Sequence, residues 1–192
     1  MGRALLLTGR PGVGKTTVIR SVVARLGAKA GGFYTEEIRE AGRRTGFRLV
    51  ALNGPKGILA SLNISGPYRV GRYGVHLSNL EQLGVESLRR AIRQPDVSVV
   101  VVDEIGKMEL FSPIFRDLVQ EGLESSKTVL GTITKARAGW VDAVKARPDV
   151  TLLEVTPANR SDLPELILDW LQGDPAGWRP HAHDGEHAPL DA

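Results

Sequence analysis

Residues 9–16 have the sequence Gly-Arg-Pro-Gly-Val-Gly-Lys-Thr, which satisfies the pattern G-x-x-x-x-G-K-[ST]. Glycines at these spacings let backbone N–H groups turn toward phosphate oxygens, and a helix that follows adds the positive end of its dipole. Lys15 can reach the β- and γ-phosphates of a nucleotide, and the hydroxyl group of Thr16 can bind Mg²⁺. The segment therefore predicts a loop that holds a triphosphate.

Two acidic residues, Asp103 and Glu104, follow directly after residues 98–102, which read SVVVV. A buried strand of this kind places the acids at the carboxyl edge of an open α/β sheet, where such sheets bind their ligands. We expect Asp103 to hold Mg²⁺ through water and Glu104 to orient and polarise a water molecule for attack on the γ-phosphate. The pair of acids favours hydrolysis over simple nucleotide binding.

Residues 103–106 also fit the pattern D-x-x-G, so a regulatory GTPase has to be considered. Such proteins usually read guanine with N-K-x-D at the end of a later strand. Residues 134–137 instead read TKAR, with Arg137 where the guanine-reading Asp would stand. We therefore expect no dedicated guanine specificity. A protein kinase is excluded because its glycine loop and catalytic motifs are of another type.

The elements that must position these residues alternate between strands and helices. The apolar run 4–7 predicts a buried strand, and residues 16–26 have apolar residues at helical spacing with Gly27 just beyond. Further helices are expected over 79–94, capped by Ser78 or Asn79 and stopped by Pro95, and over 112–125, 140–146 and 161–171. Strands are expected over 97–102, 128–134 and 150–155.

Residues 32–77 show a different pattern, with short alternating segments over 32–39, 46–52, 57–63 and 70–77. We interpret them as an antiparallel β-hairpin insertion on the sheet. The sequence thus predicts an α/β fold over 1–172, with three layers, a mostly parallel central sheet and this insertion.

The composition is that of a globular protein, with 24% charged and 42% hydrophobic residues among 192. The absence of Cys excludes disulfides, Cys-based zinc sites and a Cys nucleophile. No apolar run approaches the ~20 residues of a membrane helix, so we expect a cytoplasmic protein. Residues 1–50 hold ten Lys or Arg and three Glu, whereas residues 173–192 are acidic, and we expect that tail to be disordered. Its His181, His183 and His187 are weak metal-binding candidates.

The chain resembles the thermophilic nucleoside-triphosphatase family, which includes the cancer-related nucleoside-triphosphatases. The resemblance rests on GRPGVGKTT at 9–17, GFYTEEIRE at 32–40, RTGFRLVAL at 44–52, VGRYGV at 70–75, VVVVDEIGKMELFSPIFRDLV at 99–119 and EVTPANR at 154–160. One stretch departs from the family: residues 135–140 read KARAGW in place of a segment that often contains Pro and His.

The resemblance implies a phosphate-loop fold of RecA-like type and Mg²⁺-dependent hydrolysis of ATP, GTP and pyrimidine triphosphates, with modest base selectivity. It also implies a nucleotide-binding surface made of two segments. These are Gly9, Arg10, Pro11, Gly12, Val13, Gly14, Lys15, Thr16 and Thr17, and Val100, Val101, Val102, Asp103, Glu104, Ile105, Gly106 and Lys107.

Several further cations are weaker candidates. Lys107 and Arg160 can stabilise charge on the γ-phosphate, and Arg160, with Asn159 beside it after the last strand, can alternatively approach the base. Arg72 is a third candidate. Glu36 and Glu37 are candidates for a second pair of acids. The alternative is that they are surface residues of the hairpin that only face water.

Two other functions stay open at this point. A nucleotide or polynucleotide kinase would use the same loop, with Arg39, Arg43, Arg44 and Arg48 available for an acceptor pocket. A nucleotide-dependent module that binds nucleic acid or a protein would use hydrolysis as a timer. The sequence does not determine the oligomeric state.

Overall fold

The computed structural model describes residues 2–173. Within this range no helix is long and apolar enough to cross a membrane. The predictions made for the acidic tail and for His181, His183 and His187 concern residues outside the described range.

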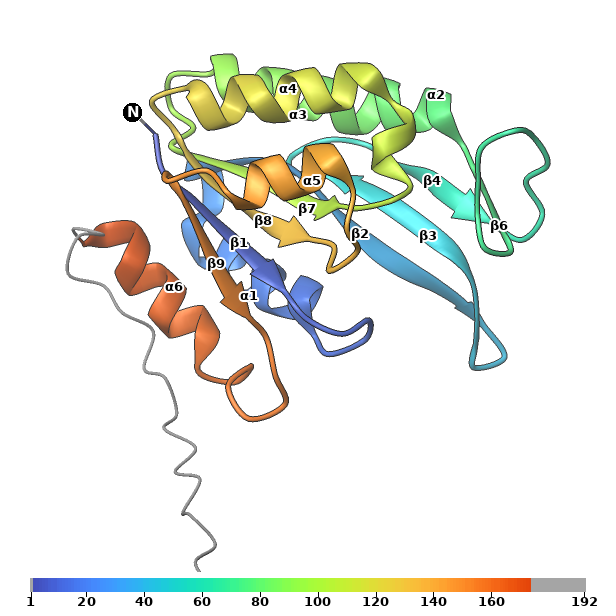
Figure 1. Cartoon of the computed structure of the whole chain (residues 1–192), viewed down its shortest axis with the longest axis horizontal. Helices are drawn as coiled ribbons and strands as arrows, with labels where there is room; N and C mark the ends of the chain where they lie inside the picture. The colour runs from blue at the N-terminus through green and yellow to red at the C-terminus, as the bar shows by residue number, and fades with distance from the viewer. Residues whose placement is uncertain (1, 174–192) are drawn as a thin grey trace, which may run out of the picture.

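One nine-stranded sheet forms the centre of the molecule, in the order β5-β6-β4-β3-β2-β7-β8-β1-β9 (Figure 1). Its parallel core pairs β2 with β7, β7 with β8, β8 with β1 and β1 with β9. These strands are rich in Val, Ile and Leu because both of their faces are covered. Their bounds are β1 Ala4–Thr8, β2 Ala30–Glu40, β7 Val99–Ile105, β8 Thr128–Ile133 and β9 Val150–Glu154.

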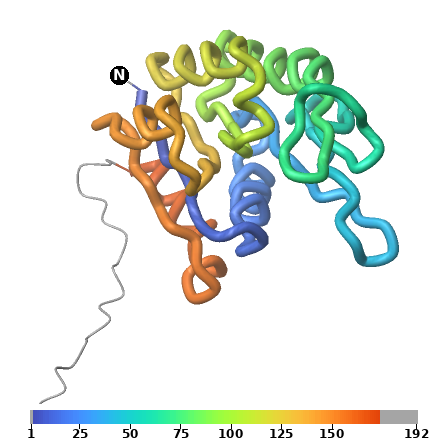
Figure 2. Tube along the Cα trace, turned by 45° about the vertical axis from the view of Figure 1, so that its right-hand side comes forward, coloured from blue at the N-terminus to red at the C-terminus, as the bar shows by residue number. Residues whose placement is uncertain are grey.

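Helices cover both faces of the sheet and make three layers. Apolar residues of α1 and α6 pack on one face, and those of α3, α4 and α5 pack on the other. The turned view shows α1 on the opposite side of the sheet from α3 and α4 (Figure 2). The fold class predicted from the sequence is therefore confirmed. The helices are α1 Lys15–Leu26, α3 Glu86–Arg93, α4 Pro113–Glu124, α5 Gly139–Lys145 and α6 Leu163–Gln172, with 3₁₀ turns at Gly27–Lys29 and Glu109–Phe111.

The segments expected as an insertion extend the same sheet. Strand β2 first runs parallel to β7 and then continues as the antiparallel partner of β3 (Arg43–Ala51). The remaining strands, β4 Lys56–Ser61, β5 Arg69–Val70 and β6 Tyr73–Val75, add antiparallel pairs beyond β3. The β2–β3 hairpin projects past the carboxyl edge of the parallel core (Figure 1).

The helix expected over 79–94 differs from its prediction at the N-terminus. It begins at Leu77 because Nδ1 of His76 accepts a 3.2 Å hydrogen bond from the N–H of Asn79, so the prediction of a Ser78 or Asn79 cap was wrong. It then passes through α2 (Leu77–Asn79) and a π-helical stretch, Leu80–Val85, before α3. Helix α3 ends at Arg93, just before Pro95.

Candidate active site

The loop between β1 and α1 has a backbone that requires glycine. Gly14, the residue before α1, has φ +111°, and Gly9 has φ +148°. A Cβ at Gly9 would also lie 2.7 Å from the carbonyl oxygen of Val155, which is too close for any side chain. The loop therefore holds a left-handed turn against the end of β9, and α1 begins directly behind it with its N-terminus open to the loop.

Lys15 folds back over this loop. Its Nζ lies 3.4 Å from the carbonyl oxygen of Gly9 and 3.5 Å from that of Arg10. Its positive charge also lowers the pKa values of Asp103 and Glu104, against the larger effect of their burial. The ammonium group is thus held between the loop and the two acids.

Asp103 is 1% exposed, and the hydroxyl groups of Thr132 and Thr16 lie beside its carboxyl group. Thr132 on β8 donates a 2.5 Å hydrogen bond to Oδ1. Burial raises the pKa of Asp103, and hydrogen bonding from Thr132 and from Thr16 opposes that rise. The carboxyl group therefore lies where the first turn of α1 meets the ends of β7 and β8.

The donor set at this point fits Mg²⁺. Oδ2 of Asp103 is buried and has no hydrogen-bond partner within residues 2–173, so a charged oxygen is left for an external ligand. The Thr16 hydroxyl beside it is a second oxygen of the kind that Mg²⁺ prefers, and phosphate oxygens and water usually complete such a site.

Glu104 is the next residue along β7 and is only half-buried. Burial raises the pKa of its carboxyl group, the charge of Lys15 opposes this, and the charge of Asp103 raises it further. A carboxylate with a raised pKa beside Lys15 and the glycine-rich loop is suited to accept a proton from water.

Comparisons with known proteins identify the family of the chain. The family model described as NTPase matches residues 4–168 of the chain. The chain belongs to this nucleoside-triphosphatase family. Among its relatives is the nucleoside-triphosphatase THEP1 of Thermotoga sp. (strain RQ2), 48% identical over 168 residues, which cover 88% of this chain and 95% of the relative. The resemblance stated from the sequence is confirmed.

Two further relatives support the membership and the fold. The human cancer-related nucleoside-triphosphatase is 42% identical over 182 residues, covering 87% of this chain and 96% of that protein, and its solution structure matches with a TM-score of 0.76. The crystal structure of THEP1 from Aquifex aeolicus matches with a TM-score of 0.80 and 40% identity, covering 88% of this chain and 99% of that chain.

This member of the nucleoside-triphosphatase family carries a third acid beside the first two. Glu109, in the 3₁₀ turn after β7, is 4% exposed. A Cβ at Gly106 would lie 3.0 Å from Oε2 of Glu109 and 3.2 Å from Cδ of Glu104, so both side chains crowd the same glycine. Burial, and then the charge of Glu104, raise the pKa of Glu109 to about 8. Sequence reasoning missed this residue, although an acid inside the apolar run Met-Glu-Leu-Phe was a signal.

Arg160 and Asn159 have different surroundings. Arg160 reaches the loop, where Nη1 lies 3.4 Å from the carbonyl oxygen of Val13. Asn159 instead stabilises its own turn, since its side chain accepts from the N–H of Thr156 and donates to the carbonyl oxygen of Glu154. Arg160 also borders a pocket of about 310 Å³ whose other walls are formed by Gly14, Thr17, Val18, Ser21, Ser161 and Pro164.

Other candidates from the sequence are buried in the core, paired with another side chain, or exposed. The side chains of Val100, Val101 and Val102 are buried in the two apolar layers, so they can only position the acids at the end of β7. Glu36 pairs with Arg20 across 3.5 Å, and Glu37 pairs with Arg39 and Arg44, so these acids do not act as one pair. The remaining predicted cations are Lys107, which is exposed, and Arg72, which contacts Tyr73.

Proposed function

We propose that this chain hydrolyses nucleoside triphosphates to diphosphate and phosphate, with Mg²⁺ and with little selectivity for the base. The observation that carries the proposal is the meeting of Lys15, Asp103 and Glu104 at the loop, together with the unsatisfied Oδ2 of Asp103. Each of these groups has a separate part in the transfer of a phosphoryl group to water.

The roles follow from the positions of the side chains. Thr16 and Asp103 would hold Mg²⁺, which supplies positive charge to the β- and γ-phosphates when bound. Lys15 and the N–H groups at the start of α1 bind the phosphate oxygens and stabilise the charge of the transition state. Glu104 orients the attacking water and accepts its proton.

Broad base selectivity is supported by the surroundings of the pocket beside Arg160. A guanidinium group stacks on purines and pyrimidines alike, because its plane and charge do not distinguish one ring from another. The turn at 134–137 offers Arg137 in place of an acid that would read guanine, and Lys135 there pairs with Glu154. The side chain of Asn159 already makes hydrogen bonds within its own turn, so we do not propose that it binds the base.

Phosphate release from ATP, GTP, CTP, UTP and the diphosphates tests the proposal, with and without Mg²⁺. We expect all four triphosphates to be hydrolysed at rates within about tenfold of one another. A base that the protein does not recognise should change the activation free energy by no more than about 1.4 kcal/mol, which corresponds to tenfold in rate. A Lys15→Ala chain serves as the control and should show no release. Label from the γ-phosphate appearing on an added nucleoside or RNA end would instead identify a kinase.

A further inference from the structure

Two arginine side chains converge on the phenol oxygen of Tyr73. Arg44 on β3 donates to it through Nε at 3.2 Å, and Arg72 donates through Nε at 3.3 Å and through Nη2 at 3.2 Å. The phenol in turn donates to the carbonyl oxygen of Arg44 at 3.3 Å. Arg44 is 29 positions from Tyr73 in the sequence and 28 from Arg72, so the arrangement is a product of the tertiary fold.

The charge around Tyr73 is unbalanced. Glu37 accepts from Arg44 at 2.7 Å and from Arg39 at 2.6 Å, so one carboxylate serves two guanidinium groups. Arg72 has no carboxylate within 4.0 Å in the described part of the chain. Three arginines therefore face one acid, which leaves this group of four side chains with a net charge of +2. The lowered pKa of Tyr73, caused first by Arg44 and then by Arg72, reports the same positive potential.

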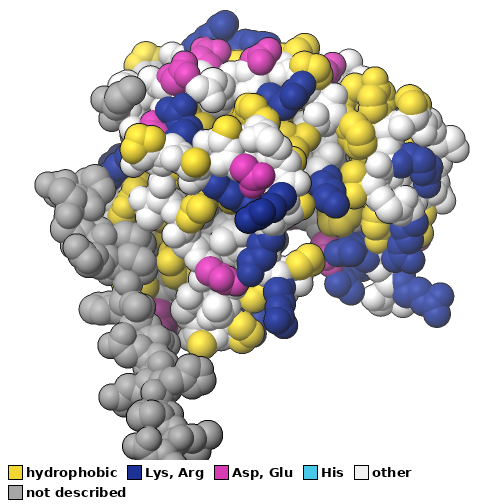
Figure 3. Space-filling view, viewed as in Figure 1, with side chains coloured by type: hydrophobic (Ala, Val, Ile, Leu, Met, Phe, Trp, Pro, Cys, Tyr) yellow, Lys and Arg dark blue, Asp and Glu magenta, His cyan; other side chains and the backbone are white. Residues whose placement is uncertain are grey.

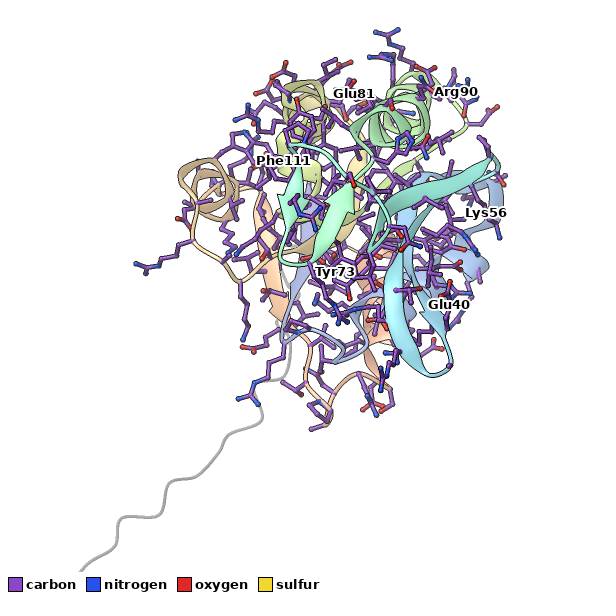
Figure 4. The ribbon with its side chains drawn as sticks, turned by 90° about the vertical axis from the view of Figure 1, so that its right-hand side faces the viewer. Glu40, Lys56, Tyr73, Glu81, Arg90 and Phe111 are labelled. Carbon is purple, nitrogen blue, oxygen red and sulfur yellow. The ribbon has the colours of Figure 1, made fainter. Side chains whose placement is uncertain are left out.

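The two guanidinium groups are held in place and remain accessible. Tyr73 is 7% exposed and packs edge-on against Phe47, with ring centroids 5.3 Å apart. Arg44 lies over the Phe47 ring at 5.0 Å, while about a third of its side chain is exposed, and Arg72 is exposed. In Figure 4, Tyr73 lies between Glu40 of the hairpin and Phe111. Fixed, accessible guanidinium groups are the usual means of binding phosphate with two hydrogen bonds each.

Strand β2 connects this cluster to the nucleotide site. The backbone of Thr35, on β2, is close enough to Asp103 to lower the pKa of that carboxyl group. Glu37 is two residues farther along the strand and on the same face, which is a step of about 7 Å. The space-filling view shows Lys and Arg side chains on both sides of the hollow between the phosphate loop and the hairpin (Figure 3). Glu37 and the arginines paired with it thus lie farther along β2 toward the hairpin than the residue next to Asp103.

We propose that Arg44 and Arg72, held by Tyr73, form a second anion site that binds a phosphate group other than those held by the phosphate loop. The group is a phosphate dianion, either free phosphate after hydrolysis or the monoester of a second molecule. The two guanidinium groups are fixed by Tyr73, so the site does not depend on a nucleotide to form.

Calorimetric titration of inorganic phosphate into the full chain saturated with Mg²⁺ and AMPPNP tests this site. We expect saturable binding that weakens about tenfold or more in R44Q/R72Q, because each lost hydrogen bond to a charged group is worth about a factor of ten. R43Q is the matched control: Arg43 is an exposed neighbour on the same hairpin, and its loss should change the affinity by no more than about twofold. If R44Q/R72Q does not fold, the same titration with R72Q alone tests the site, because Arg72 is an exposed residue in a turn.

The outcomes separate the two proposals. No phosphate binding, or equal binding by R44Q/R72Q and the parent chain, would overturn the second site. Weaker binding of AMPPNP but not of ADP in R44Q/R72Q would also overturn it, because the arginines would then contact the γ-phosphate. Tighter binding of ribose 5-phosphate than of phosphate would assign the site to a second substrate, and the reverse order to the departing product. Failure of the chain to bind AMPPNP would contradict the proposed hydrolysis, and the difference in phosphate binding between the parent chain and R44Q/R72Q would still test the second site.

Discussion

The hydroxyl group of Thr132 donates a 2.5 Å hydrogen bond to Oδ1 of Asp103, and it does so in the interior, where Thr132 is 0% exposed and Asp103 is 1% exposed. The two residues lie on the neighbouring parallel strands β8 and β7. Because Oδ1 is occupied in this way, Oδ2 is the oxygen left for a ligand. Thr132 therefore determines which oxygen of the Asp103 carboxylate stays available to a ligand.

Replacing this threonine should change the metal requirement more than the fold. Thr132→Val keeps the shape of the side chain and removes the donor, so the carboxylate of Asp103 is no longer fixed in one orientation. Loss of a group that orients a metal ligand typically costs 10- to 100-fold in metal affinity. We expect the Mg²⁺ concentration for half-maximal hydrolysis to rise by about tenfold or more. Thr128→Val, at the other end of β8, is the control, and an equal rise there would contradict the assigned role.

Removing the charge of Glu104 should separate binding from turnover. Glu104→Gln retains size and hydrogen bonding but cannot accept a proton from water, so kcat should fall by ~10²-fold or more. The affinity for AMPPNP, measured by calorimetry, should stay near that of the parent chain. Hydrolysis at the parent rate would show that another group activates the water.

The buried acid Glu109 should make the protein less stable as the pH rises. Its pKa in the native state is about 8, above the ~4.3 of a free glutamate, so the native state binds the proton more tightly than the unfolded chain does. This contribution to stability is complete below the unfolded pKa and is lost as the pH rises through 8. Its slope is at most about 1.4 kcal/mol per pH unit.

Urea unfolding of the parent chain and of Glu109→Gln at pH 6 and pH 9 measures this effect. Gln keeps the neutral form at every pH, so the free energy of unfolding of the variant should fall less between the two pH values. Asp103 and Glu104 are present in both proteins, and the comparison therefore isolates Glu109. The same pH dependence in both proteins would mean that Glu109 is ionised in the native state.

Arg160 should contribute to binding of the nucleoside and not of the phosphates. Arg160→Ala removes the cation beside the pocket, and a lost contact between a cation and a ring costs about 0.5–2 kcal/mol. We expect the affinity for Mg²⁺-ADP to fall several-fold, with a similar loss for GDP. Inorganic tripolyphosphate, which has no base, is the control ligand. An equal loss of tripolyphosphate binding would place Arg160 on the phosphates instead.

The sequence alone determined the glycine-rich turn between the first strand and helix, the acids after the valine strand and the alternation of strands and helices. These features are local: glycine spacing, apolar periodicity and turn residues act over a few neighbours and are visible in the order of residues. The helix cap at His76 could not be predicted in this way, because His is not among the usual capping residues.

Only the tertiary structure decided which side chains meet. Thr132 reaches Asp103 because β7 and β8 pair in one particular register, and Glu109 acquires its raised pKa because the turn after β7 is buried beside Glu104. Arg44 and Arg72 converge on Tyr73 because β3 and the turn before β6 are brought together through β4. Burial and the approach of distant strands determine the pKa values and decide which side-chain atoms are left to bind a ligand. Neither burial nor these long-range contacts can be read from a single segment of the sequence.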